Sequence, residues 1–139
     1  MARNNNIFEL IPQREPMVMV DEHISTENNT TLTRFSIEPS TLFIENNVLT
    51  EAGLIENIAQ SAAVHSGFLF KQSGNSKAPV GFIASIQELQ INFHPQIGNQ
   101  LITEIKFLDE VMGVSIIEGT ILLNQQVVAY CKMKIFLKE

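Results

Sequence analysis

The sequence predicts an α+β domain in which a curved antiparallel sheet wraps around one long central helix. Residues 50–71 are mostly apolar and have the features of a single helix, and residues 80–137 have the pattern of four long strands. One helix cannot cover both faces of such a sheet, so the sheet should curve around it. The outer face or the edge of the sheet is then a natural place for a partner subunit, and we expect a homodimer.

The first expected elements lie in the N-terminal third of the chain. Residues 7–12 should form a short helix or turn that ends at Pro12. Residues 17–20 are an apolar run and residues 30–38 alternate between the two faces, so we expect both segments to be strands. The turn-forming segment TENN lies between them, which predicts a hairpin.

The central helix is predicted for residues 50–71. Thr50 can cap its start, Glu51 places a negative charge in the first turn, where the helix dipole favours one, and Gly74 lies just past its end. Its apolar residues leave only a narrow polar face, which is typical of a buried helix. One carboxylate, Glu56, lies in the second turn. A lone acid on a buried helix is costly unless it is paired, hydrogen-bonded or used.

The C-terminal half should form the rest of the sheet. The expected strands are residues 80–93, 101–112, 114–123 and 125–137. Pro95 and Gly98 interrupt the chain after the first of them. Two of the links, Met-Gly and Asn-Gln, are tight, so these strands should pair as an antiparallel meander.

The composition is that of one ordinary domain, which we expect to cover residues 1–139. Hydrophobic residues make up 45% of the chain, enough for a full core. We find no apolar run long enough to span a membrane and no signal peptide, so we expect a cytoplasmic protein. The net charge of −6 argues against nucleic-acid binding. Cys131, the single cysteine, should be a small core or sheet residue.

The three histidines are far apart in the sequence and lack metal-ligand spacing, so we expect neither a metal nor a cofactor. His23 follows an acidic pair and should be a surface residue with a raised pKa. His94 should lie in a surface loop. His65 comes nine residues after Glu56, which places the two side chains on opposite sides of the helix. We therefore expect His65 to be a core or interface residue rather than the partner of Glu56.

Three segments resemble a known family. The opening IPQREPMVMVDE, residues 11–22, is similar to the Leu-Pro-His-Arg-X-Pro-hydrophobic-hydrophobic-Asp opening of FabZ-type 3-hydroxyacyl-[acyl-carrier-protein] dehydratases. The segment GLIENIAQSAAVHSG, residues 53–67, resembles their central helix, and it is most similar to the ApeP-like branch, the dehydratases of aryl-polyene pathways. Residues 81–95, GFIASIQELQINFHP, also resemble a strand of that branch. The resemblance spans residues 8–135 and implies the hotdog fold.

The resemblance also implies a chemistry. In the family a histidine takes the C2 proton of a 3-hydroxyacyl thioester, an acid on the central helix protonates the departing hydroxyl, and backbone N–H groups at the helix start polarise the carbonyl. Glu56 matches the acid, Gly53 the glycine that opens the helix, and Gln60 the helix glutamine. We therefore expect Glu56 to be catalytic and Gly53 and Gln60 to bind the substrate, with Gln60 also orienting Glu56.

The chain departs from the family at its histidines. The Gly-His-Phe-Pro motif that precedes the helix in FabZ-type enzymes is replaced by STLFIENNVLTEAG, residues 40–53, which contains no histidine. The ApeP-like branch commonly keeps the histidine of the opening Leu-Pro-His, and Gln13 stands there instead. A glutamine amide does not titrate near neutral pH. Gln13 is therefore expected to line the catalytic pocket without serving as a general base.

The function that the resemblance implies is a hydro-lyase of fatty-acid or aryl-polyene-type biosynthesis. Its partner would be an acyl carrier protein with a phosphopantetheine-linked acyl substrate, and its second subunit either an identical chain or another hotdog protein. Two alternatives stay open: a non-catalytic hotdog subunit that binds carrier protein or an active dehydratase, and a hotdog thioesterase. Carrier proteins are acidic, and the cations that could receive one are Arg14, Lys71 and Lys77.

Overall fold

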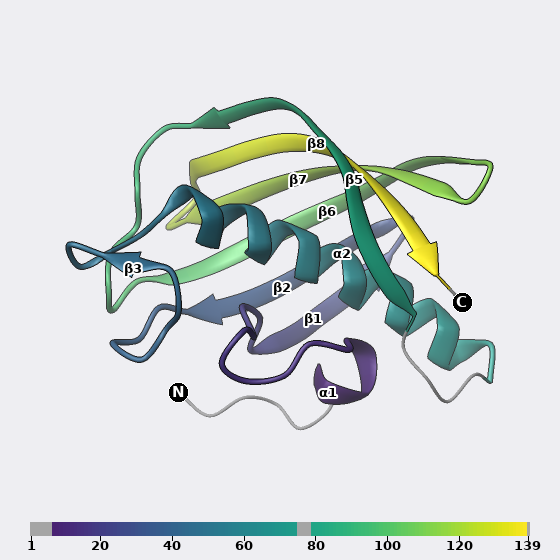
Figure 1. The fold of residues 1–139 in the computed structure, drawn as a ribbon, viewed down its shortest axis with the longest axis horizontal. Coiled ribbons are helices and arrows are strands. Elements are labelled where there is room, and N and C mark those ends of the chain that lie inside the picture. The colour runs from purple at the N-terminus through teal and green to yellow at the C-terminus, as the bar shows by residue number, and fades with distance from the viewer. Residues whose placement is uncertain (1–6, 75–78, 139) are drawn as a thin grey trace.

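In the computed structural model, which describes residues 7–74 and 79–138, one six-stranded sheet curves around a single long helix (Figure 1). The helices are α1 (Ile7–Leu10) and α2 (Glu51–Gln72). The sheet strands are β1 (Glu22–Glu27), β2 (Thr30–Ser36), β5 (Val80–Ile91), β6 (Gln100–Val111), β7 (Val114–Leu123) and β8 (Gln126–Lys138). A separate small hairpin consists of β3 (Ile44–Glu45) and β4 (Val48–Leu49). The predicted α+β hotdog architecture is confirmed.

The central helix begins and ends within a residue of its predicted bounds. Thr50 occupies the N-cap position with extended backbone, but its side chain makes no capping hydrogen bond, so that part of the prediction is wrong. Gly74 has a φ of +90° and its N–H donates to the carbonyl of Lys71, which ends the helix where the sequence indicated. The face of α2 that carries Leu54 and Ile58 is buried against the concave side of the sheet.

The N-terminal apolar run differs from its prediction, because residues 17–20 lie outside the sheet and the first strand starts at Glu22. Side chains of α2 bind this segment instead. Asn57 Nδ2 donates to the Met19 carbonyl (2.7 Å), and Gln60 Oε1 accepts from the Met19 N–H (2.6 Å). These amides satisfy backbone groups that a neighbouring strand would otherwise bind, so residues 18–20 are buried without being a strand, while Met17 is exposed.

The sheet order is β1-β2-β6-β7-β8-β5, and every pairing is antiparallel. A hairpin is present at the predicted turn, where Asn28 and Asn29 both have positive φ, but its first strand is β1 and not the predicted residues 17–20. Strands β6, β7 and β8 form the predicted meander. The remaining strand of that prediction, β5, comes before β6 in the sequence but does not lie next to it. It pairs with β8 at the far edge of the sheet. The connection after β5 carries the chain past the start of α2, so β6 begins beside β2 (Figure 1).

The core fills the space between α2 and the sheet. On β2 the buried positions alternate, with Thr31, Thr33 and Phe35 facing inward, as the sequence pattern indicated. Cys131 is fully buried on β8, and burial raises its thiol pKa to about 11, as suits the predicted core residue. None of the described helices is long and apolar enough to cross a membrane.

Candidate active site

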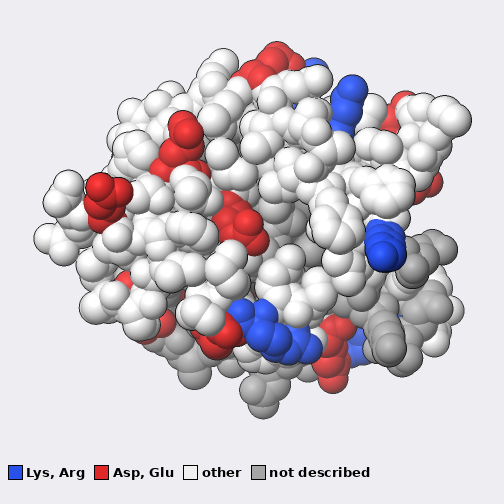
Figure 2. All heavy atoms as spheres, in the orientation of Figure 1, with Lys and Arg blue, Asp and Glu red and all other residues white. Residues whose placement is uncertain are grey.

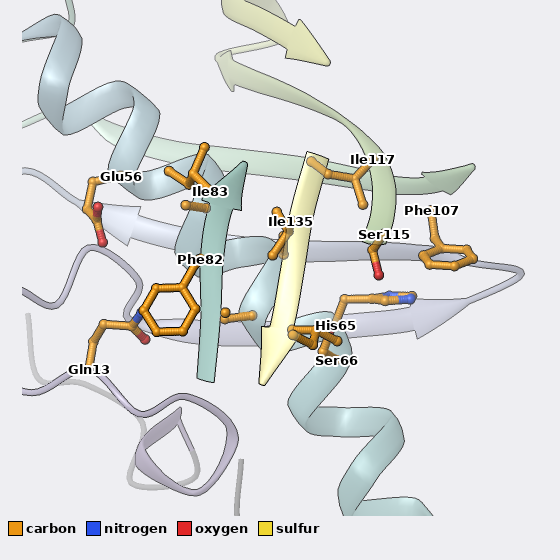
Figure 3. A pocket seen from close by; sticks show the side chains of 15 residues that line it. Gln13, Glu56, His65, Ser66, Phe82, Ile83, Phe107, Ser115, Ile117 and Ile135 are labelled. Carbon is orange, nitrogen blue, oxygen red and sulfur yellow. The ribbon is translucent and has the colours of Figure 1, made fainter. Parts of the chain in front are cut away.

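A pocket of about 240 Å³ lies between α2 and the neighbouring ends of β5, β6, β7 and β8 (Figure 3). Most of its lining is apolar and comes from alanines of α2 and from large side chains of the strands. Its polar lining residues are Gln13, Glu56, His65, Ser66 and Ser115. An apolar cavity with a few convergent polar groups is the usual form of a small-molecule site.

The polar residues gather at the two ends of this pocket. Glu56 and Gln13 lie at one end, and His65 and Ser115 at the other, with Phe82 between them (Figure 3). Glu56 and His65 are nine residues apart on α2, which corresponds to a rise of roughly 13.5 Å along the helix. The two side chains therefore line one pocket without acting as a pair on the same atoms, in keeping with the helical spacing.

Glu56 is the one carboxylate among the described residues that line the pocket. It lies on the second turn of α2 and is partly buried. Its Oε2 accepts a 2.7 Å hydrogen bond from Gln60 Nε2, one turn further along the same face. The carboxylate is thus held in one orientation while it stays open to the pocket.

Gln60 is fully buried and is not part of the pocket lining. Its Nε2 donates to the Met17 carbonyl (2.7 Å) as well as to Glu56, and its Oε1 accepts from the Met19 N–H. Both amide protons are in use, since a glutamine has only two. This side chain therefore ties the N-terminal segment to α2 and orients Glu56, as the i, i+4 spacing predicted. Direct contact of Gln60 with substrate stays a prediction.

Gln13 lines the pocket at the Glu56 end. Its Oε1 is buried and has no hydrogen-bond partner among the described residues, so an acceptor is available to a bound molecule. The turn that presents it is braced by Arg14, whose guanidinium donates to the carbonyls of Phe8 (3.1 Å), Ile11 (2.9 Å) and Gln13 (2.8 Å). Gln13 therefore lines the pocket beside Glu56, and a part for it in catalysis stays a prediction.

Gly53 lies in the first turn of α2, one turn before Glu56, and is buried. An added Cβ would lie 2.4 Å from Leu49 Cδ1 and 3.2 Å from Phe43 Cβ, so packing alone requires a glycine there. Gly53 is not among the residues that line the pocket. Its role in binding the substrate carbonyl stays a prediction.

The cations proposed for carrier-protein binding are mostly engaged. Arg14 braces the turn at Gln13, and Lys71 forms an ion pair with Glu9. Lys77 lies outside the described residues. Figure 2 shows acidic side chains scattered over one face, with basic side chains in separate small groups among them. The described surface therefore offers no broad basic patch on that face.

The histidines differ in their surroundings. His94 is an exposed loop residue, as predicted, with Nδ1 2.9 Å from the Leu49 carbonyl oxygen. The prediction for His23 is wrong, because burial lowers its pKa and its ring packs 4.7 Å from Phe68. His65 is only 3% exposed and stacks on Phe107 at 5.9 Å, so it is the predicted core histidine, but it also lines the pocket. No cluster of histidine, cysteine and carboxylate side chains within the described chain could hold a metal ion.

Two pocket residues were missed by sequence reasoning. Ser66 and Ser115 line the cavity near His65. A signal for Ser115 was present, because it stands on the same strand parity as the buried Ile117 and so faces the helix. For Ser66 the signal was weaker, since it follows Glu56 by ten residues and lies on a neighbouring part of the helix surface.

A six-stranded sheet wrapped around one long helix defines a hotdog-fold protein, and its pocket holds a carboxylate on that helix. More particularly, the chain belongs to the ApeP-like family, described as ApeP dehydratase, whose pattern matches residues 5–139. It is 29% identical over 143 residues to the 3-hydroxyacyl-[acyl-carrier-protein] dehydratase FabZ of Vibrio atlanticus (strain LGP32), covering 96% of this chain and 91% of that protein.

Solved structures show the same fold. A chain of the dehydratase heterocomplex ApeI:P from Xenorhabdus doucetiae superposes with a TM-score of 0.83 at 17% identity, over 99% of this chain and 93% of that one. The E. coli PaaI protein superposes with a TM-score of 0.64 at 12% identity, over 83% of this chain and 81% of that one. At these identities the likeness shows the fold alone.

Proposed function

We propose that this protein is a hydro-lyase that removes water from 3-hydroxyacyl thioesters carried on the phosphopantetheine arm of an acyl carrier protein. The observation that carries the proposal is the Glu56 carboxylate, which opens into an apolar pocket and is held by Gln60. Membership of the ApeP-like dehydratase family and the similarity to a FabZ protein support this reaction. Fatty-acid or aryl-polyene-type biosynthesis is the setting that these relatives suggest.

We assign both proton transfers to Glu56. Its carboxylate takes the C2 proton, the C2 electron pair forms the C2–C3 double bond, and the C3–O bond breaks. The protonated Glu56 then gives this proton to the departing hydroxyl, which leaves as water, so no proton is gained or lost overall. Gln60 donates a hydrogen bond to this carboxylate, whereas His65 lies at the opposite end of the pocket and so is not placed to share these proton transfers.

Two further groups would assist at the Glu56 end. The unpartnered Oε1 of Gln13 can accept a hydrogen bond from the 3-hydroxyl and so hold it near Glu56. Backbone N–H groups in the first turn of α2, around Gly53, and the helix dipole would stabilise negative charge that develops on the thioester carbonyl. Recognition of the carrier protein would then rest mainly on its acyl-phosphopantetheine arm, because Arg14 and Lys71 are engaged elsewhere.

A second subunit would cover β5. The outer edge of this strand is unpaired in the described sheet, and β5 exposes Val80, Phe82, Ile83 and Ile86. A long, apolar, open edge is a template for pairing with another strand. We propose that a second hotdog chain adds to this edge. An identical chain is the simplest partner, and the heterocomplex formed by ApeI:P makes a different hotdog chain the alternative.

One observation favours a second function. The histidine that the family uses as its base is absent at both of its known places, which fits a non-catalytic subunit that binds an acyl chain for an active partner. Hotdog neighbours that are described as thioesterases share the fold alone.

One experiment distinguishes the dehydratase, the thioesterase and the non-catalytic subunit. The purified protein is incubated with 3-hydroxydecanoyl carrier protein, and the mass of the loaded carrier is followed for wild type and Gln13→His. Loss of water with the wild type is the expected result. Loss of the whole acyl group would indicate a thioesterase. Activity in Gln13→His alone would mean a dehydratase scaffold without its base, and inactivity of both would favour the binding subunit.

A further inference from the structure

His65 has one ring nitrogen that nothing in the described chain satisfies. Its Nδ1 lies 2.7 Å from Thr31 Oγ1, whereas its Nε2 is buried and has no hydrogen-bond partner among the described residues. An orphaned polar atom in a buried side chain costs free energy, and such atoms in native proteins call for an explanation. His65 lines the pocket, so its ring borders the space that a bound molecule would fill.

The ring is held in place by a chain of side-chain hydrogen bonds. Thr31 Oγ1 lies 2.7 Å from Thr26 Oγ1, and Thr26 Oγ1 lies 2.7 Å from His23 Nε2. Each hydroxyl can donate one hydrogen bond and accept another, so the chain can run in either direction. In one direction Nε2 of His65 carries the proton, and in the other it is a bare acceptor. This nitrogen can therefore serve either a donor or an acceptor on a ligand.

The protonation state of His65 favours a neutral ligand group. Desolvation lowers its pKa, and the nearby His23 lowers it further, so the ring is neutral at pH 7. A neutral ring gives no charge with which to offset the burial of a carboxylate. A ligand hydroxyl suits both directions of this series of hydrogen bonds, because a hydroxyl donates as well as accepts. The hydroxyl of Ser115 lies beside the same end of the pocket (Figure 3).

We propose that His65 and Ser115 form a second polar subsite, which binds a hydroxyl group at the far end of the acyl chain. This inference rests on the proposed function, since it places the reacting carbons at Glu56 and the chain along the apolar wall formed by Phe82 and Ile135. The separation of Glu56 and His65 along α2, roughly 13.5 Å, then makes the subsite selective for chain length.

Binding to the unreacting protein tests the inference apart from turnover. Affinities are measured by calorimetry for N-acetylcysteamine thioesters of octanoic, decanoic and dodecanoic acid and for their ω-hydroxy derivatives. We expect the hydroxyl to tighten binding by roughly three- to tenfold at one chain length, the gain of one buried hydrogen bond. Equal affinity within every pair would overturn the inference while leaving the proposed function in place. Failure of all six to bind would overturn both.

Substitutions of His65 test whether this residue causes the gain in affinity from the ω-hydroxyl group. His65→Leu should lose the gain from the ω-hydroxyl, His65→Gln should keep part of it because an amide still forms hydrogen bonds, and the exposed His94→Gln should change nothing. A gain that persists in folded His65→Leu would overturn the inference. If His65→Leu does not fold, the ¹⁵N resonance of His65 Nε2 decides with wild-type protein: the ω-hydroxy ligand should shift it and the plain ligand should not, and identical spectra would contradict the proposal.

Discussion

Gln60 Nε2 donates a 2.7 Å hydrogen bond to Glu56 Oε2, and the same amide nitrogen donates a second 2.7 Å bond to the carbonyl of Met17. One buried side chain thus connects the pocket carboxylate to the segment that precedes the sheet. The orientation of Glu56 and the docking of the N-terminal segment therefore depend on the same residue. Replacing that residue should affect stability and activity together.

Gln60→Leu should destabilise the fold by about 2–4 kcal/mol, because it leaves the buried Met19 N–H and the Met17 carbonyl without the amide that binds them. The free energy of unfolding in urea measures the effect. Gln72→Leu, at the exposed end of the same helix, is the matched control and should change stability by less than about 0.5 kcal/mol. Equal effects of the two substitutions would contradict the role given to Gln60.

Gly67→Ala should destabilise the contact between α1 and α2. A Cβ at this position would lie 1.9 Å from the carbonyl oxygen of Leu10, and a backbone atom cannot rotate away as a side chain can. We expect a cost of about 1–3 kcal/mol from overpacking, although alanine is the better helix former. Urea unfolding measures it, with Ser66→Ala as the neighbouring control. A stability gain in Gly67→Ala would show that the helices do not approach so closely.

Stability should fall on acidification because of His23 and His65. Burial lowers the pKa of each ring below its ordinary value of 6.5, so the unfolded chain binds more protons than the folded chain at acid pH. Their contribution is fully present above about pH 6.5 and is lost as the pH falls through the folded-state pKa values. Urea unfolding between about pH 7.5 and about pH 5.5 should show a shallower decline for His65→Gln than for wild type. Parallel declines would exclude His65 as a source.

The edge of β5 should determine association. Ile86→Lys places a charge on this edge strand and should turn a dimer into a monomer, while Ile24→Lys, on β1 at the opposite edge and about equally exposed, should not. Light scattering gives the mass in solution. A monomeric wild type that dimerises only with a second hotdog protein would support the hetero-assembly. Dimers that survive Ile86→Lys would place the interface elsewhere.

Much of the architecture follows from local sequence pattern. The helix over residues 50–71, the alternation on β2 and the turns of the meander are all local features, and each lies within a few residues of its prediction. The Glu56–Gln60 contact was also predictable, since residues four apart on a helix face one another. Contacts between segments that are far apart in the sequence were not predictable in this way. Residues 17–20 have the composition of a strand, yet amides of α2 bind them.

The candidate active site was likewise only partly predictable from local sequence pattern. Helical spacing correctly separates the directions of Glu56 and His65, but it does not reveal that one pocket extends around the helix far enough to reach both. The orphaned Nε2 of His65 depends on Thr31, which is 34 positions away in the chain. The place of β5 beside β8 depends on the course of the connection after β5, and Pro95 and Gly98 indicate a break there without indicating where the chain goes next. Such features appear only when the three-dimensional structure brings the segments together.

The central claim is that the Glu56 carboxylate performs the proton transfers of a dehydration. The most direct test compares wild type and Glu56→Gln on a 3-hydroxyacyl carrier protein, with loss of water followed by mass and folding checked by urea unfolding. We expect turnover by wild type and a loss of at least about 10²-fold in Glu56→Gln, at nearly unchanged stability because the side chain is partly exposed. Equal rates for the two proteins would contradict it.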